Sequence, residues 1–270
     1  MTSKTRLLLV LGCTQRCGSN HLSWTLRQHP AINAVRHIWE HHLVTSLHDL
    51  ESYVTNVTGR WGKGWDPDGT HARDLRRSLG TGCERFLRGL ARPYDGTPRY
   101  LLAKSPDARN LRLLQEYLPD AVAVVIVRDG RDVVASLTRS FNITFDEALE
   151  SWQRAATALL ASEQERVPFL RVNYETLFRD SEAETRRILR YLDLDENAYD
   201  YDRIDQLPVR GSSTFGRGQG PVSWEPVART AEFQPIGRWQ SWSPEQLDRF
   251  DERVGPLNQA LGFPAGSEPA

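Results

Sequence analysis

Short apolar runs alternate with amphipathic segments along most of the chain. Apolar runs at 6–11, 100–103, 121–127 and 168–172 have the length of buried β-strands. The spacing of apolar positions predicts helices at 20–28, 107–117, 131–139, 145–166, 182–192 and 243–261. Strands that alternate with helices in this way are typical of an α/β fold with a mostly parallel sheet.

Two stretches interrupt the alternation. Residues 37–90 are rich in polar residues and contain three tryptophans, Trp39, Trp61 and Trp65. We interpret this stretch as a helical insert that covers the site. Residues 206–220 are rich in Gly, Ser and Arg and predict a long loop, a feature that is often functional in a compact domain. A length of 270 residues suits one domain, so we expect a single domain over 1–270 with this insert and a C-terminal loop and helix at 206–264.

The composition limits which binding partners and which cellular compartment we expect. The formal net charge is −1, so no overall field draws the chain to nucleic acid or a membrane, and any anion site must be built locally. Three cysteines are too few for a disulfide framework, and no second Cys pair or suitably spaced His pair completes a zinc site. The sequence begins without the apolar core of a signal peptide and has no run long enough to span a membrane. We therefore expect a cytoplasmic protein.

The loop after the first apolar run is a candidate anion site. In an open α/β sheet, ligands bind at the carboxyl ends of the strands. The backbone N–H groups of Gly18, Ser19 and Asn20 open the next helix, for which Ser19 or Asn20 is the expected N-cap. Arg16 adds a positive charge and Thr14 a hydroxyl group. A plain strand–turn–helix connection is the alternative interpretation, and the loop lacks the lysine of a Walker A motif.

A second candidate anion site follows the run at 121–127. Arg128 stands at the end of this run and Ser136 lies eight residues further, nearly two turns into the next helix. This spacing allows both side chains to reach one phosphate. Asp129 and Asp132 are expected to fix the turn or to pair with Arg131. A surface cluster of ion pairs is the alternative.

Several segments resemble one family. The segment Gln15-Arg16-Cys17-Gly18-Ser19-Asn20 resembles the 5′-phosphosulfate loop of sulfotransferases that use 3′-phosphoadenosine 5′-phosphosulfate (PAPS), with Cys17 in place of the usual Ser. The segment 128–136 resembles the 3′-phosphate motif of that family. Lys104, one of only three lysines, resembles its strand-tip Lys, and Tyr174 resembles the Tyr near its adenine. The segment 208–213 resembles the Arg-Ser-Ser/Thr loop of tyrosyl-protein sulfotransferases and their bacterial relatives, which adds Arg210, Ser212 and Ser213.

The resemblance implies a P-loop-kinase-like fold of about five parallel strands, and a PAPS donor that needs no metal. It also implies that Arg16 and Lys104 stabilise the leaving phosphate, with help from Ser212 or Ser213. In the matching region of the tyrosyl-protein branch the general base is a glutamate, so Glu40 is the first candidate here, before His41 or His37.

The expected acceptor is a hydroxyl group of a small molecule, such as a glycosylated natural product or a glycolipid. The three tryptophans of the insert are candidates to stack on it. An ATP-dependent kinase and an inactive protein that binds PAPS or its product PAP remain as alternatives. The sequence carries no signal of oligomeric state.

Overall fold

The computed structural model describes residues 5–35, 40–62, 64–213, 222, 225–230 and 233–264. A five-stranded sheet forms the centre of the molecule, with the strand order β2-β3-β1-β4-β5 and only parallel neighbours. The strands are β1 (Arg6–Gly12), β2 (Ile32–Ala34), β3 (Tyr100–Ser105), β4 (Val122–Val127) and β5 (Leu170–Asn173). The predicted α/β class and the number of strands are confirmed.

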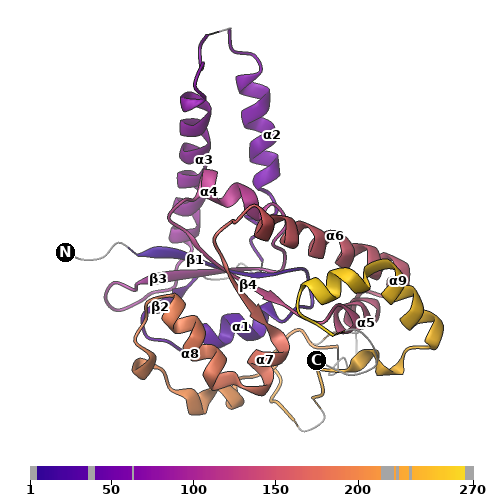
Figure 1. Cartoon of the computed structure of the whole chain (residues 1–270). Helices are drawn as coiled ribbons and strands as arrows, with labels where there is room; N and C mark the ends of the chain where they lie inside the picture. Colours follow the sequence, from indigo (N-terminus) through magenta and orange to yellow (C-terminus); the bar gives the residue numbers. More distant parts are fainter. Residues whose placement is uncertain are drawn as a thin grey trace.

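Helices cover both faces of the sheet. Figure 1 shows α1 (Ser19–Leu26), α7 (Tyr174–Arg179) and α8 (Ser181–Tyr191) on one face, and α5 (Gly130–Phe141), α6 (Phe145–Gln164) and α9 (Pro244–Ala260) on the other. The neighbouring inner strands β1 and β4 are buried almost throughout, which explains why their sequences are nearly continuously apolar. All five strands run in one direction, so the loops after them meet at one edge of the sheet.

Local hydrogen bonds fix the starts of three helices. The side chain of Asp129 accepts from the backbone N–H of Arg131 and caps α5. Thr144 with Glu147 caps α6, and Ser243 with Gln246 caps α9, each as a reciprocal capping box. Since each cap is a local pattern of residues, the predicted positions of these helices agree with the structure to within about two residues.

Three details of the prediction are wrong. The N-cap of α1 is Gly18 in a left-handed conformation, not Ser19 or Asn20. The helix expected at 107–117 is a 3₁₀ turn (Leu111–Leu113) followed by the short α4 (Leu114–Tyr117), because Asn110 adopts a positive φ of 67° that breaks the first turn. The short β2 and α7 lack a periodic pattern of their own and were not predicted.

The stretch at 37–90 contains a helical hairpin of α2 (Leu47–Thr58) and α3 (Thr70–Gly89). Figure 1 shows the hairpin projecting away from the sheet beside α4, and the α3 backbone at Gly80 lies against Tyr117. No residue of α2 or α3 lines the cavity that contains the predicted site residues, so the hairpin does not cover that cavity as expected. Trp61 and Trp65 lie in the α2–α3 connection, outside the cavity. His37 and Trp39 lie outside the described residues.

Short 3₁₀ turns complete the path at Glu196–Ala198, Tyr201–Gln206 and Arg238–Ser241. The structure describes the predicted loop at 206–220 as far as Ser213. In this part of the loop, Val209 pairs with Val227 in an antiparallel bridge. Within the described part of the chain, no helix has both the length and the apolar composition needed to cross a membrane.

Candidate active site

A cavity of about 350 Å³ lies at the carboxyl ends of β1 and β4, where the loops of the sheet meet. Many of the predicted site residues line it: Gln15, Arg16, Gly18, Ser19, Asn20, Glu40, Arg128, Ser136, Tyr174, Arg210 and Ser212. Five others lie outside its wall: Thr14, Cys17, His41, Lys104 and Ser213. The topology therefore brings together side chains more than 190 positions apart, such as Gln15 and Arg210.

The loop between β1 and α1 forms the floor of the cavity. Arg16 adopts a positive φ of 70°, an uncommon conformation for a non-glycine residue that turns its side chain into the cavity. Thr14 and Cys17 are buried in the core behind the loop, and burial raises the pKa of the Cys17 thiol to about 12. Cys17 thus packs as a small neutral residue, in keeping with the small side chain that the motif requires.

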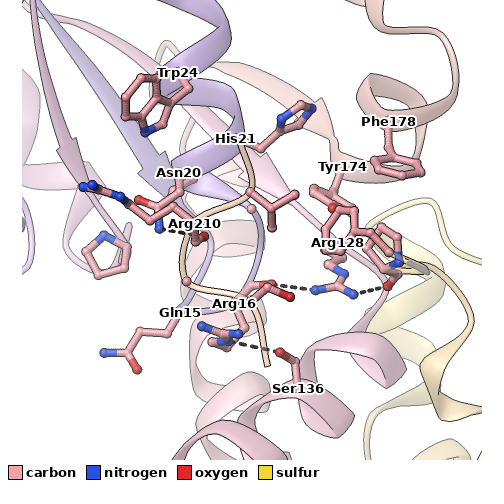
Figure 2. A pocket seen from close by; sticks show the side chains of 18 of the residues that line it. Gln15, Arg16, Asn20, His21, Trp24, Arg128, Ser136, Tyr174, Phe178 and Arg210 are labelled. Atoms are coloured by element: carbon pink, nitrogen blue, oxygen red, sulfur yellow. Dashed lines mark hydrogen bonds between the residues drawn. The ribbon is translucent and has the colours of Figure 1, made fainter. Parts of the chain in front are cut away.

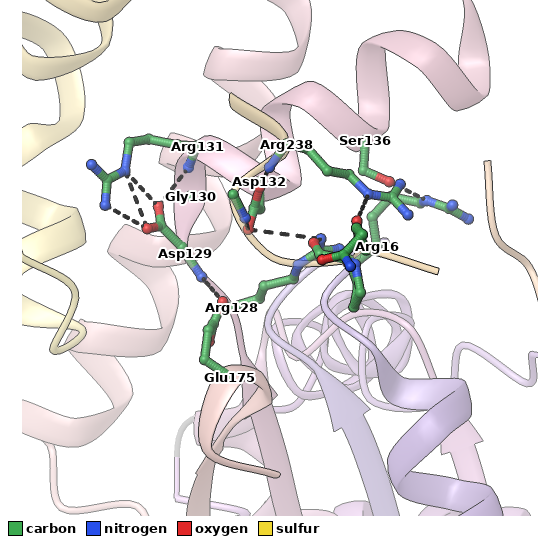
Figure 3. Close-up of polar contacts among 12 residues, drawn as sticks. Arg16, Arg128, Asp129, Gly130, Arg131, Asp132, Ser136, Glu175 and Arg238 are labelled. Carbon is green, nitrogen blue, oxygen red and sulfur yellow. Dashed lines mark hydrogen bonds and ion pairs between the residues drawn. The ribbon is translucent and has the colours of Figure 1, made fainter. Parts of the chain in front are cut away.

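Arginines converge at the edge of this floor. Arg16, Arg128 and Arg238 line the cavity together (Figure 3), and Arg210 and Arg229 line other parts of it. Burial, followed by repulsion from Arg128 and Arg238, lowers the pKa of Arg16 to about 10. Burial and the charge of Arg128 lower the pKa of Arg238 to about 10 as well. Guanidinium groups that are buried this close together form a site that a bound anion would stabilise.

Arg128 is held in place by backbone groups. Its Nη1 donates to the carbonyl oxygen of Arg16 at 2.9 Å, its Nη2 donates to that of Pro235, and its guanidinium lies 4.9 Å from the centre of the Tyr174 ring. The side chain is buried, with its Nε unpartnered among the described residues. Asp132, at 3.9 Å, is the one carboxylate of the described chain within ion-pair range of Arg128.

Ser136 joins the two predicted anion sites. Arg16 Nε donates to Ser136 Oγ at 3.0 Å across the cavity (Figure 2). Residues predicted for the 5′ loop and for the 3′ motif are thus in direct contact, and the two predicted anion sites adjoin each other.

The two aspartates of the second motif are structural. Asp129 is buried and pairs with Arg131 at 2.6 Å, as expected. Asp132 instead accepts from the backbone N–H groups of Gly237 and Arg238, at 2.9 and 2.6 Å. These bonds fasten the segment that carries Arg238 to the start of α5, so the aspartate positions a third guanidinium at the cavity.

Glu40 and Lys104 form an ion pair at one end of the cavity. Lys104 Nζ lies 3.0 Å from Glu40 Oε1, and His42 Nε2 lies 3.6 Å from Glu40 Oε2. Glu40 faces the cavity, while Lys104 stands behind it on β3. His41 lies outside the wall: its Nδ1 accepts from the backbone N–H of Leu43, and burial lowers its pKa to about 4. Because His41 does not line the cavity, it is a poorer candidate base than Glu40.

The loop at 208–213 closes the cavity from the side of α1. The amide of Asn20 donates to the carbonyl oxygen of Arg210 at 3.5 Å, which ties this loop to the first one. Ser212 lines the cavity. Ser213 lies behind the wall, and its Oγ accepts from Arg238 Nη1 at 2.9 Å. Of the two serines, Ser212 is the one placed to contact a ligand directly.

A family model described as the sulfotransferase family matches residues 8–198 of the chain. The match covers well over half of the chain, including both anion motifs and the strand-tip lysine. The chain belongs to the sulfotransferase family. The predicted sulfotransferase activity is thereby confirmed, and the family match speaks against the kinase alternative.

Relatives and solved structures agree with this assignment. Protein-tyrosine sulfotransferase A of Caenorhabditis elegans is 22% identical over 99% of this chain and 70% of its own length. Protein-tyrosine sulfotransferase 1 of Danio rerio is 24% identical over 71% of this chain and 56% of its own length. The fold is similar to that of the sulfotransferase domain of the Synechococcus PCC 7002 olefin synthase (TM-score 0.56, 19% identity, covering 98% of this chain and 97% of that one). A sulfotransferase from Alicyclobacillus acidocaldarius has a TM-score of 0.53 at 15% identity, over 96% and 95% of the two chains.

Some cavity residues of this sulfotransferase were not predicted from sequence. Five aromatic side chains also line the cavity: His21, Trp24, Phe141, Phe178 and Phe233. Tyr174 stacks on Phe178 with ring centres 6.0 Å apart, and burial lowers the pKa of His21 to about 4. Only the adjacency of His21 and Trp24 to the first loop could have pointed to them, because the other aromatics come from distant segments.

Gly18 is required by its contacts. Its φ is +95°, and an added Cβ would lie 2.3 Å from the Tyr174 ring. We expect Gly18→Ala to lower the free energy of unfolding by about 2–4 kcal/mol, from backbone strain and overpacking together. Gly69 is the matched control, because its φ is +72° but an added Cβ meets nothing within 4 Å. Urea unfolding of Gly69→Ala should show only the backbone cost of about 1 kcal/mol, and equal losses in both variants would contradict the role of the Tyr174 contact.

In the described segments of the chain, no group of three or more His, Cys, Asp or Glu side chains is arranged to hold a metal ion.

Proposed function

We propose that this chain transfers the sulfuryl group of PAPS to a hydroxyl group of a small-molecule acceptor. The observation that carries the proposal is the convergence of Arg16, Arg128 and Arg238 on one cavity, where the charge of Arg128 contributes to the lowered pKa of both other guanidiniums. PAPS carries an anionic group at each end of its ribose, a phosphosulfate at the 5′ position and a phosphate at the 3′ position. A chain with a net charge of −1 that gathers its cations here is suited to such a donor.

The donor would be held at both anionic ends. The free backbone N–H groups at the start of α1 and the guanidinium of Arg16 suit the 5′-phosphosulfate. Arg128 and Ser136 suit the 3′-phosphate, and the buried Arg128 Nε supplies a donor that lacks a partner in the described part of the chain. The Tyr174 ring, packed beside Arg128, is available to the adenine.

Catalysis by these residues requires a base and a stabilised leaving group. PAPS supplies the sulfuryl group, whose bond to the 5′-phosphate breaks as the bond to the acceptor oxygen forms. Glu40 faces the cavity and accepts the proton of the acceptor hydroxyl. Lys104 and Arg16 stabilise the negative charge that develops on the leaving phosphate, and Ser212 adds a hydroxyl donor. The ion pair between Lys104 and Glu40 holds the base and the leaving-group cation next to each other.

We expect kcat to fall on the alkaline side at a lower pH than the ordinary pKa of a lysine would give. Burial lowers the pKa of Lys104 below its usual 10.5, and the Glu40 carboxylate opposes this shift. The protonated form stabilises the leaving group, so kcat should fall as the pH rises through this lowered pKa. In Glu40→Gln the opposing charge is absent, and the remaining activity should decline at a still lower pH. If kcat declines at the same alkaline pH in the wild type and in Glu40→Gln, the expected effect of Glu40 on the pKa of Lys104 is contradicted.

Turnover tests the proposed function. The purified chain is incubated with PAPS and a panel of hydroxylated small molecules, including phenols, phenyl glycosides and glycolipids, and PAP formation is measured. A tyrosine-containing acidic peptide is added because the curated relatives are named for protein tyrosine. PAP formation that depends on a small acceptor supports the proposal. PAP formation with the peptide alone would show that the acceptor is a peptide tyrosine rather than a small molecule. PAP binding without any turnover would favour a protein that binds the donor but is inactive.

A further inference from the structure

A second group of guanidiniums surrounds Trp24, apart from the donor arginines. Trp24 lies on α1 and lines the cavity. The guanidinium carbon of Arg27 lies 4.9 Å from the centre of the Trp24 ring, and that of Arg210 lies 5.9 Å from it. Figure 2 shows Trp24 and Arg210 on one side of the cavity, with Tyr174, Phe178 and Arg128 on the other.

Positive charge is concentrated around this ring. Burial and then the charges of Arg92 and Arg210 lower the pKa of Arg27. Neither Arg27 nor Arg92 forms an ion pair with a carboxylate among the residues that the structure describes. Arg27 is the C-cap of α1, where the carbonyl groups of the helix end attract one cation. The helix end does not account for a second guanidinium, that of Arg210, beside the same indole ring.

The group adjoins the proposed acceptor end of the cavity. Glu40, Arg210 and Trp24 all line this cavity, and Lys104 pairs with Glu40 from behind its wall. Arg27 borders the cavity through its contact with the Trp24 ring. The donor arginines gather instead around Ser136 and Tyr174, on the opposite side.

We propose that the acceptor carries an anionic group, a carboxylate or a phosphate, that binds between Arg210 and Arg27 with the adjoining ring of the acceptor against Trp24, while its hydroxyl group lies at Glu40. The acceptor is then a hydroxylated aromatic or sugar acid. This inference rests on the proposed function, since Glu40 defines the acceptor end. It places Arg210 with the acceptor, although the sequence resemblance groups this arginine with the donor.

Matched probes test the charge preference without requiring turnover. Binding of 4-hydroxyphenylacetate, its uncharged methyl ester and 4-hydroxyphenyl phosphate is measured by calorimetry on the full chain, with and without saturating PAP. We expect the acid to bind at least about 10-fold more tightly than the ester, as charge-assisted hydrogen bonds imply. The phosphate probe distinguishes the two possible anions. Whichever of the carboxylate and phosphate probes binds more tightly identifies the anionic group of the acceptor.

Substitutions of the two arginines test whether they cause the preference for the anionic probe. Arg27→Gln and Arg210→Gln should each reduce the ratio of acid to ester affinity about 5-fold or more, and should leave ester binding within about 2-fold. Arg85→Gln, at an exposed position on α3, is the control and should leave the ratio unchanged. An anionic probe that binds no better than the ester, or not at all, overturns the inference, as does a ratio that survives both variants.

The failure of this inference is distinguishable from failure of the proposed function. PAP affinity is measured in the same samples. If PAP binds tightly and the probes show no charge preference, only the acceptor assignment fails. If PAP does not bind, the proposed function fails. If Arg210→Gln weakens PAP more than the acid, Arg210 belongs to the donor site and the inference is overturned.

Discussion

Arg128→Ala is expected to weaken PAP binding about 100- to 1000-fold. Truncating one partner of a desolvated, charge-assisted contact costs more than an exposed one, because the phosphate is left without its bidentate donor. Arg128 is buried, and its Nε lacks a partner within the described residues. The loss should appear in the dissociation constant measured by calorimetry with purified protein.

The control for this variant must separate binding from folding. Arg128 also donates to the carbonyl oxygens of Arg16 and Pro235, so the substitution will lower the melting temperature to some extent. Arg154→Ala, which removes an exposed arginine paired with Glu150 on α6, should change neither property appreciably. A folded Arg128→Ala protein that binds PAP as tightly as the wild type would contradict the role of Arg128.

Glu40→Gln is expected to lower kcat about 100- to 10 000-fold, the range typical for loss of a general base. The amide has nearly the same shape as the carboxylate but cannot accept the proton of the acceptor hydroxyl. PAP affinity should stay within about 2-fold of the wild type, because Glu40 pairs with Lys104 and lies near His42, whereas Arg128 has its carboxylate neighbour in Asp132. Steady-state kinetics with a saturating donor measures the effect.

Two comparisons make this result specific. Glu150→Gln removes an exposed carboxylate on α6 and should leave kcat unchanged. Glu40→Asp keeps a carboxylate but draws it back by one methylene, so it should retain more activity than Glu40→Gln. A Glu40→Gln enzyme with near wild-type kcat would exclude Glu40 as the base and direct attention to its neighbour His42, 3.6 Å away.

The parts of the fold that the sequence revealed are those set by local chemistry. The apolar run of β4, the Asp129 cap of α5 and the capping boxes of α6 and α9 are each written within a few consecutive residues. The N-cap of α1 was misplaced because the conformation of Gly18 is decided by the Tyr174 ring, more than 150 positions away in the sequence. The hairpin could be expected to be helical, but its direction depends on packing against α4, which no local pattern encodes.

The same distinction applies to the site. Arg16 and Arg128 were predicted because they follow strand ends, and parallel strands bring such ends together. Ser136 was predicted from its spacing of eight residues after Arg128. Arg238 as a third cation, and the aromatic group of Trp24, Phe178 and Phe233, depend on long-range placement. Asp132 fastens Arg238 to α5 through backbone bonds that have no sequence signature.

The most direct test of the donor assignment is a calorimetric titration of the purified chain with PAP and, separately, with ATP–Mg²⁺, each with and without EDTA. We predict tight binding of PAP that survives EDTA and is lost in Arg128→Ala. Metal-dependent binding of ATP with no binding of PAP would contradict the assignment of PAPS as the donor.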